Sequence, residues 1–321
     1  MSDPKTDTGM TDNSSFDRLR CPETGARLVR DGDVLRAESS ARSYRLNDLG
    51  VPLFAESFLS SDAERQRDHY DRIAAAYVEH LDYPHTEVYT DYLDRALYEA
   101  IGTRDLGVTA ELCCGRGEAL RLLSDRIREG IGVDISEEML NAAIHEGVRD
   151  TWTLVQGDAT KVPLADESVD SVVMLGGIHH VNDRDGLFRE IARILKPGGR
   201  FYWREPVSDF LLWRGLRALI YRLSPALDHE TERPLRYIET RQPLDDAGLT
   251  LDHWRTYGYA GFCLFMNSDV LVFNRLFRFL PGIRALTRFS VWVDDVLART
   301  PGMRMRGLQV VGVASKKDEA T

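Results

Sequence analysis

Residues 109–118 read TAELCCGRGE and place two adjacent cysteines and two glycines directly behind an acidic residue. The apolar run VTAEL indicates a strand that leads into this stretch, and EALRLL indicates a helix that follows it. A turn between a strand and a helix is where a parallel α/β sheet binds its cofactor. Gly115 and Gly117 have no Cβ, so the backbone there can approach a ligand closely. The stretch therefore predicts a cofactor-binding turn.

The sequence beyond this turn alternates between short apolar runs and amphipathic stretches. The apolar runs lie at 130–135, 151–158, 169–176 and 200–207, and the amphipathic stretches lie at 117–127, 136–147 and 183–195. A repeated order of strand and helix predicts an α/β fold whose parallel sheet is doubly wound, with helices on both faces. Ahead of it, apolar residues recur at helical spacing from Asp62 to Ile101.

Composition limits the class of protein. The 321 residues carry a formal net charge of −10, which disfavours a general attraction to nucleic acid. Cys21, Cys113, Cys114 and Cys263 have the spacing of neither a disulfide framework nor a metal site, which indicates a reducing, cytoplasmic setting. The sequence has no run of about 18 apolar residues to span a membrane. Residues 1–15 lack the order of a signal peptide, and we expect a disordered tail there.

Acidic residues follow the first three strands of the predicted sheet. Asp134 ends the second strand, where its carboxylate can accept hydrogen bonds from both hydroxyls of a ribose. Asp158 closes the third strand, with Ala159 beside it, and can accept the exocyclic amine of an adenine. Glu111 and Glu118 would repel a pyrophosphate and suit the ammonium of an amino acid. A dinucleotide enzyme with the same layout remains open on this pattern, because a glycine-rich turn alone has low specificity.

Residues 70–205, together with the run LQVVGVASK at 308–316, resemble the class I S-adenosylmethionine-dependent methyltransferases. The segments similar to that family's motifs are ELCCGRG, VDIS, GDATKVPLADESVDSVV and LKPGG. Cys113 is a departure, since many members have glycine at this position of the turn. The resemblance implies a Rossmann-like, mostly parallel sheet of seven strands and S-adenosylmethionine as the cofactor.

The resemblance also implies how the cofactor is held. Glu111 would bind the methionine ammonium directly or indirectly, Asp134 the ribose and Asp158 the adenine amine. Ile135 and Met139 would pack on the adenine. Tyr70 or Tyr77 in YDRIAAAY would cap the sulfonium, unless both tyrosines only pack within their helix. The other residues assigned to the cofactor are Gly115, Gly117, Ala159 and Leu175.

Little catalytic machinery is needed, because the methyl group of a sulfonium is already activated for transfer. The protein has to align donor and acceptor and, for a weakly nucleophilic acceptor, remove a proton. His179 and His180 in GGIHHV follow the fourth strand at the ligand-binding edge and are candidate bases, with His180 first because it lies deeper in the loop. Glu205 is a third candidate, unless it pairs with Arg204 or Arg241. A histidine that only holds its own loop is the alternative for either imidazole.

The unit at 16–60 raises a separate question. Its segments LRCPETGARL and SYRLNDLGVPLF resemble the small zinc-ribbon-like proteins that activate tRNA and protein methyltransferases. A zinc ribbon needs four ligands, and Cys21 is the only cysteine left in this unit. We therefore expect a β module without metal, which packs on the catalytic domain or shapes its entrance.

We assign residues 61–321 to the methyltransferase domain, with helical insertions at about 206–238 and 260–306 that act as a lid. Both insertions mix arginines with large apolar residues, and residues 256–306 hold seven arginines against three aspartates. Such segments line a pocket for an apolar substrate, lie at a membrane surface, or form a lid or a dimer seam. These interpretations stay open.

We predict methyl transfer to a small, apolar or lipid-like acceptor, by O- or C-methylation. One alternative is a tRNA or protein methyltransferase, which the module at 16–60 suggests and the net charge disfavours. A second alternative is a regulatory protein that binds the cofactor without turnover. Contact with the membrane surface and a homodimer both remain open partners.

Overall fold

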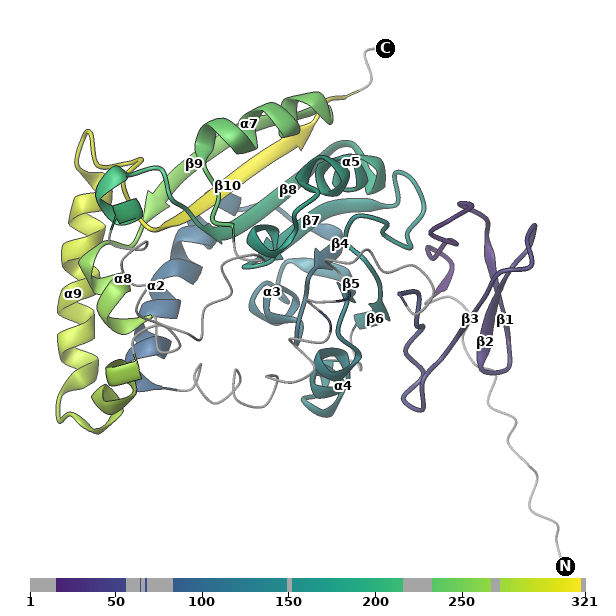
Figure 1. Ribbon diagram of the computed structural model, residues 1–321, viewed down its shortest axis with the longest axis horizontal. Coiled ribbons are helices and arrows are strands. Elements are labelled where there is room, and N and C mark those ends of the chain that lie inside the picture. Colours follow the sequence, from purple (N-terminus) through teal and green to yellow (C-terminus); the bar gives the residue numbers. More distant parts are fainter. Residues whose placement is uncertain are drawn as a thin grey trace, which may run out of the picture.

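The computed structural model describes residues 16–55, 64, 67, 83–148, 152–215, 233–266 and 272–318. A seven-stranded sheet lies at its centre, in the order β6-β5-β4-β7-β8-β10-β9 (Figure 1). The strands are β4 (Gly107–Leu112), β5 (Ile127–Asp134), β6 (Trp152–Gln156), β7 (Val169–Leu175), β8 (Leu195–Pro206), β9 (Leu249–Tyr257) and β10 (Gln309–Lys316). β10 pairs antiparallel with both β8 and β9, and the pairs from β6 to β8 are parallel. The predicted doubly wound, mostly parallel sheet is confirmed.

Helices cover both faces of this sheet (Figure 1). On one face pack α5 (Arg184–Ile194) and α7 (Tyr237–Asp246). On the other pack α2 (Pro84–Ile101), α3 (Glu118–Leu122), α8 (Ala260–Phe265) and α9 (Ile283–Arg299). α4 (Glu137–His145) packs near the β5–β6 edge. Two 3-10 segments, η3 (Ile178–His180) and η4 (Val272–Phe279), accompany these helices, and residues 211–215 are also helical.

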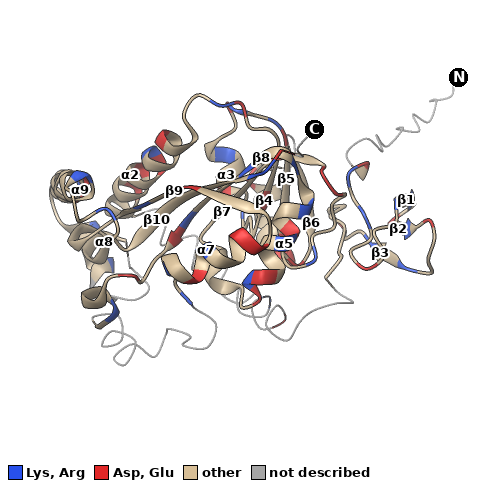
Figure 2. Cartoon of the chain, turned by 90° about the horizontal axis from the view of Figure 1, so that it is seen from above, with Lys and Arg blue, Asp and Glu red and all other residues tan. Residues whose placement is uncertain are grey.

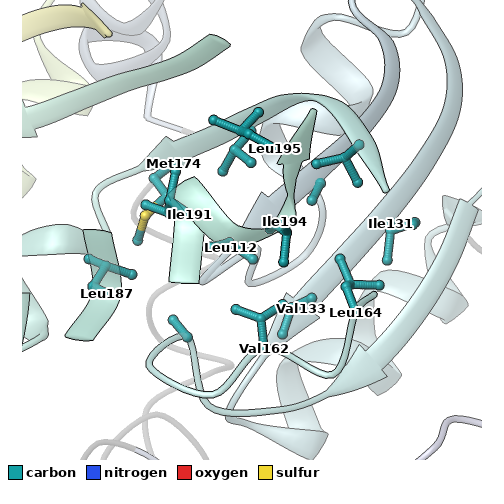
Figure 3. Packing of buried hydrophobic residues seen from close by; sticks show 14 of the residues in the cluster. Leu112, Ile131, Val133, Val162, Leu164, Met174, Leu187, Ile191, Ile194 and Leu195 are labelled. Carbon is teal, nitrogen blue, oxygen red and sulfur yellow. The ribbon is translucent and has the colours of Figure 1, made fainter. Parts of the chain in front are cut away.

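The central strands read as continuous apolar runs because both of their faces are covered. Every residue of β4 is buried, and the core forms where α5 lies against the middle of the sheet. Figure 3 shows Leu187, Ile191 and Ile194 of α5 in one cluster with Leu112 of β4 and Met174 of β7. This packing fixes the strands whose carboxyl ends carry the candidate site.

A small antiparallel sheet of β1 (Leu28–Asp31), β2 (Val34–Ala37) and β3 (Ser43–Arg45) lies beside β6 in Figure 1. The segment after β3 continues the large sheet, since Gln156 donates its amide to the Pro52 carbonyl and accepts from the Phe54 amide. The module thus covers an edge strand that would otherwise expose unpaired backbone groups. The described residues of this unit therefore pack against the edge of the large sheet.

Some elements differ from the sequence-based expectations. The stretch 117–127 forms only the short helix α3 before the chain turns into β5. β9 was not predicted, although Leu249 and Leu251 alternate with polar residues at its start. The expected tail at 1–15 lies outside the described residues. None of the described helices is long and apolar enough to cross a membrane.

Candidate active site

The candidate site lies where the strand order of the sheet reverses. β4 pairs with β5 on one side and with β7 on the other, so the loops after β4 and β7 leave the same point of the sheet. Ligands bind at this point in open α/β sheets, outside the carboxyl ends of the strands. The antiparallel β10 between β8 and β9 departs from the dinucleotide-binding order 3-2-1-4-5-6. The strand order therefore argues against the dinucleotide alternative.

The two adjacent cysteines fill space beside glycines of neighbouring segments. Cys113 has a left-handed backbone, with φ +51°, and a Cβ added at Gly177 would lie 2.6 Å from the Cys113 Cβ. A Cβ added at Gly132 would lie 2.9 Å from the Cys114 Sγ. Burial raises the pKa of both thiols. Among the described residues, no group of three or more His, Cys, Asp and Glu side chains is placed to hold a metal ion.

Of the two glycines of the turn, Gly115 faces open space, whereas a Cβ on Gly117 would lie 3.1 Å from the Val148 Cγ1. Gly115 has φ +50°, and a Cβ built on it would meet no heavy atom within 4 Å. Gly117 has φ +73° and forms the N-cap of α3. Both positions favour glycine because L side chains rarely adopt this backbone conformation. The turn is therefore shaped by its backbone, with open space in front of Gly115.

Glu111 is buried behind this turn. Its two carboxylate oxygens accept hydrogen bonds from the amides of Ala119 at 2.8 Å and Leu120 at 2.9 Å, at the start of α3. Burial raises the pKa of Glu111 to about 8, and the two amide hydrogen bonds oppose that shift. In this arrangement Glu111 holds the first turn of α3 in place.

Asp134 links the turn to the second strand. Its Oδ2 accepts a hydrogen bond from the Gly115 amide at 2.7 Å, and its Oδ1 accepts one from the Ser136 amide at 2.9 Å. Ser136 in turn caps α4 by accepting from the Met139 amide. The carboxylate therefore sits at the turn with a fixed orientation, at the edge where a ligand would bind.

The other residues assigned to the cofactor lie on the same edge. Asp158 follows β6 and accepts two hydrogen bonds at Oδ1 from Thr160, from its amide and its hydroxyl. The remaining side chains assigned there are Ile135 and Met139 beside Asp134, Ala159 beside Asp158, and Leu175 at the end of β7, with Met139 and Ala159 buried and the other two half-buried. Tyr70 and Tyr77 lie outside the described residues.

The loop after β7 is organised by Glu205. This carboxylate is fully buried and accepts hydrogen bonds from the amides of Gly177 at 2.6 Å and Ile178 at 2.8 Å. Its Oε2 lies 2.8 Å from the Nδ1 atom of His179. Burial raises the pKa of Glu205 to about 7, and the amide hydrogen bonds and the neighbouring His180 oppose the shift. Glu205 thus orients one imidazole and is itself screened from solvent.

The two histidines differ in their surroundings. His179 has the carboxylate partner, and the ring of His180 packs against that of His179 with a centroid distance of 3.8 Å. The expected alternative pairings of Glu205 are wrong, because Arg204 pairs with Asp94 and Arg241 with Asp245. The sequence named all three residues but missed the hydrogen bonds that join them, because these form between β8 and a loop 26 to 28 residues earlier.

Asn47 of the N-terminal module also reaches the cofactor side and was not predicted. Its amide nitrogen donates to Glu137 at 2.8 Å and to Asn141 at 3.1 Å, both on α4 directly after Asp134. Its Oδ1 accepts from the amides of Leu49 and Val51, a turn geometry that asparagine favours. The only signal in the sequence was an asparagine in a turn, which does not indicate a partner 90 residues away.

Comparison with known proteins agrees with this geometry. Residues 110–203 match the family described as methyltransferase domain. A ubiquinone/menaquinone biosynthesis C-methyltransferase of Caulobacter sp. (strain K31) is 42% identical over 82 residues, which cover 25% of this chain and 32% of that protein. A demethylmenaquinone methyltransferase of Tropheryma whipplei (strain Twist) is 31% identical over 165 residues, covering 49% of this chain and 64% of the relative. The chain thus spans less than two thirds of the length of either relative.

Solved structures show the same fold. A putative methyltransferase of Haloferax volcanii, solved in complex with the Trm112 methyltransferase activator, superposes with a TM-score of 0.53 at 23% identity, over 79% of this chain and 99% of that chain. Phosphoethanolamine N-methyltransferase 2 of Haemonchus contortus, solved with S-adenosyl-L-methionine, gives a TM-score of 0.54 at 16% identity, over 83% of this chain and 62% of that chain.

The fold, the glycine-rich turn and the acidic strand ends define a class I methyltransferase domain, as predicted. Residues 110–203 carry the match to the methyltransferase domain family, which supports S-adenosylmethionine as the cofactor. The residues present fit that cofactor, since a Cβ on Gly115 would meet no heavy atom within 4 Å and the Asp134 carboxylate lies beside this glycine.

Proposed function

We propose that the chain transfers a methyl group to a small hydroxylated acceptor and that His179 is the general base. The observation that carries the proposal is the 2.8 Å contact between His179 Nδ1 and the buried Glu205 carboxylate, at the ligand-binding edge of the sheet. A carboxylate on one nitrogen fixes the tautomer and orientation of an imidazole and raises its basicity at the other. We therefore assign the positioning role to Glu205 and prefer His179 to His180.

The cofactor supplies a methyl group bonded to a positively charged sulfur, and S-adenosylhomocysteine remains after transfer. The task of His179 is to take the hydroxyl proton of the acceptor on Nε2 while Glu205 stabilises the resulting imidazolium. For O-methylation, the acceptor oxygen forms the new bond as the bond between sulfur and methyl breaks. For C-methylation of a phenolic ring, the deprotonated hydroxyl makes the neighbouring carbon nucleophilic, and that carbon afterwards loses its own proton.

The acceptor class rests on the relatives and on the acidic net charge. The two relatives compared above are named for the biosynthesis of quinones, and a quinone in its reduced form is an aromatic ring with hydroxyl groups. Such a molecule offers the acidic hydroxyl that the pair of His179 and Glu205 can deprotonate. The net charge of −10 disfavours tRNA as the acceptor.

The test uses single-turnover methyl transfer from labelled S-adenosylmethionine to a 1,4-dihydroxynaphthalene with a short isoprenoid chain. His179→Gln should lower the rate by about 10² to 10⁴ and leave the affinity for the cofactor nearly unchanged. His145→Gln is the matched control, because His145 is exposed on α4, and should retain the full rate.

Other outcomes separate the alternatives. Labelling of tRNA or a protein in place of the naphthalenediol would contradict the small-molecule acceptor. Cofactor binding by calorimetry without transfer to any of these acceptors would support a regulatory protein. A near-normal rate in His179→Gln, with a loss in His180→Gln, would move the base to the second histidine.

A further inference from the structure

The helix α9 has a buried face and an exposed face, and both carry apolar side chains. One face is buried against α2 and α8, and its members recur at helical spacing: Ile283, Thr287, Val291, Asp294 and Ala298. The outward face carries large apolar side chains that are exposed to solvent, namely Leu286, Phe289, Trp292 and Val296. Phe289 and Trp292 are each 61% exposed, and their rings stack with a centroid distance of 5.8 Å. Large exposed apolar groups that gather on one face mark a site of interaction.

The orientation of α9 is fixed by its buried acid. Asp294 accepts hydrogen bonds from the Tyr89 hydroxyl of α2 and from the amides of Tyr259 at 2.9 Å and Phe262 at 3.3 Å. Rotating the helix to bury Phe289 and Trp292 would expose this carboxylate and leave two amides and a hydroxyl without it. The outward face is therefore a stable property of the fold.

The segment η4 extends the exposed apolar surface. It contacts α9, and Leu276, Phe279 and Leu280 at and just after it are exposed. Asn274 anchors this segment, since it lies 2.7 Å from the His85 Nε2 of α2 and donates to the Leu264 carbonyl at 2.7 Å. We call the exposed side chains of 276–296 the α9 face. It lies at the end of the molecule away from β1–β3 (Figures 1 and 2).

Arginines outnumber acidic side chains around the α9 face, where Arg284 pairs with Glu87 of α2 at 2.6 Å. Residues 272–299 contain five arginines and two aspartates. One of these aspartates is the buried Asp294, and the other, Asp295, pairs with Arg299 at 2.8 Å. Arg288 is exposed on the helix itself, and the guanidinium of Arg278 lies 4.8 Å from the centre of the Phe279 ring. A surface that meets this face must supply negative charge next to an apolar layer.

We propose that the α9 face docks on a lipid bilayer that carries anionic headgroups. An interfacial helix of this kind buries Trp, Phe and Leu at the boundary of the headgroups and acyl chains, while its arginines reach the phosphates. A second copy of the chain fits the face less well, because a two-fold interface would bring together more arginines than carboxylates, and Glu87 and Asp295 already pair with Arg284 and Arg299. The rest of the chain carries the negative net charge, so an anionic surface would repel it and orient this face inward.

The test measures binding of the full chain to sedimented vesicles of phosphatidylcholine with about 30% phosphatidylglycerol, and to vesicles of phosphatidylcholine alone. The native chain should prefer the anionic vesicles. The double variant Phe289→Ala/Trp292→Ala should bind at least about tenfold more weakly. Arg288→Gln should lose about fivefold on anionic vesicles only. Ile238→Ala is the matched control, because Ile238 is 72% exposed on α7 outside the α9 face. It should bind like the native chain.

A second readout does not depend on affinity. Brominated lipids should quench tryptophan fluorescence in the native chain, and Trp292→Phe should lose most of that quenching. Absence of vesicle binding, or equal binding by the double variant, would overturn the proposal. A concentration-dependent dimer in sedimentation that the double variant abolishes would instead assign the face to a second copy. Neither readout involves methyl transfer, so the result stands apart from that of the His179 test.

Discussion

The contact between Cys113 and Gly177 allows a quantitative test of how the turn after β4 fits the loop after β7. Gly177→Ala would place its Cβ 2.6 Å from the Cys113 Cβ and 3.0 Å from the Met174 Cε. Carbon atoms prefer about 3.5 to 4.0 Å, so the loop has to move by roughly 1 Å. Overpacking of this size destabilises a protein by about 1 to 3 kcal/mol. We expect that loss of unfolding free energy in urea.

Cys113→Gly should remove most of this penalty. The substitution deletes the Cβ that blocks a methyl group introduced at position 177, and it also relieves a left-handed backbone that costs an L residue about 1 to 2 kcal/mol. It loses the packing of a half-buried thiol, so we expect Cys113→Gly alone to change stability by less than about 1 kcal/mol. In the double variant, Gly177→Ala should therefore cost at least about 1 kcal/mol less than in the native background.

The double-mutant cycle decides the matter through the coupling energy. Independent sites add to within about 0.5 kcal/mol, so a coupling below that value would refute the packing argument. Cys114→Ala combined with Gly177→Ala is the control cycle. Cys114 lies against Gly132, and this cycle should be additive. Unchanged m-values would show that the variants alter stability without altering the compactness of either state.

The acids and the N-terminal module carry the remaining predictions. Burial raises the pKa of Glu111 to about 8, so the folded chain keeps a proton that the unfolded chain releases near pH 4.5. The free energy of unfolding should therefore fall as the pH rises from about 4.5 to 8. Glu111→Gln should flatten that slope in urea titrations at pH 5, 6, 7 and 8. The rate of methyl transfer should rise about tenfold per pH unit below pH 7 and level off above it. The reason is that burial raises the pKa of Glu205 to about 7, and only the carboxylate form can stabilise a protonated His179. A rate that stays constant from pH 5.5 to 7.5 would argue against this pair. Asp134→Ala should weaken cofactor binding by more than about tenfold in calorimetry, and an affinity equal to that of the native chain would contradict this. Asn47→Ala should lower the free energy of unfolding by about 1 to 2 kcal/mol, and a stability equal to that of the native chain would contradict this.

Local features of the sequence predict the parts of the site that a single strand and its turn define. Gly115 and Gly117 stand in a turn whose left-handed backbone favours glycine, and this preference is visible in sequence. Asp134 ends an apolar run, so its place at the sheet edge follows from the strand alone. The alternation of strands and helices similarly predicts a doubly wound sheet without knowledge of any contact.

The remaining features depend on contacts between distant segments. The departure from glycine at Cys113 is visible in sequence, but its match to Gly177 becomes apparent only when β4 and β7 lie side by side. β9 was missed because only Leu249 and Leu251 among its first residues alternate with polar ones, and the strand is recruited by pairing with β10. The partner of Asn47 on α4 is equally non-local.

Two adjacent histidines look alike in the sequence, and a buried acid distinguishes them in the structure because its carboxylate lies 2.8 Å from the Nδ1 atom of His179. His179 and His180 are the same residue type, one position apart, and both follow β7. Glu205 comes from the neighbouring strand β8, and its burial disfavours a charged carboxylate unless donors surround it. The amides of the loop supply those donors, and they also bring the His179 ring to the same carboxylate. Orientation of one imidazole is therefore a consequence of satisfying a buried charge, and this is why we assign the base to His179.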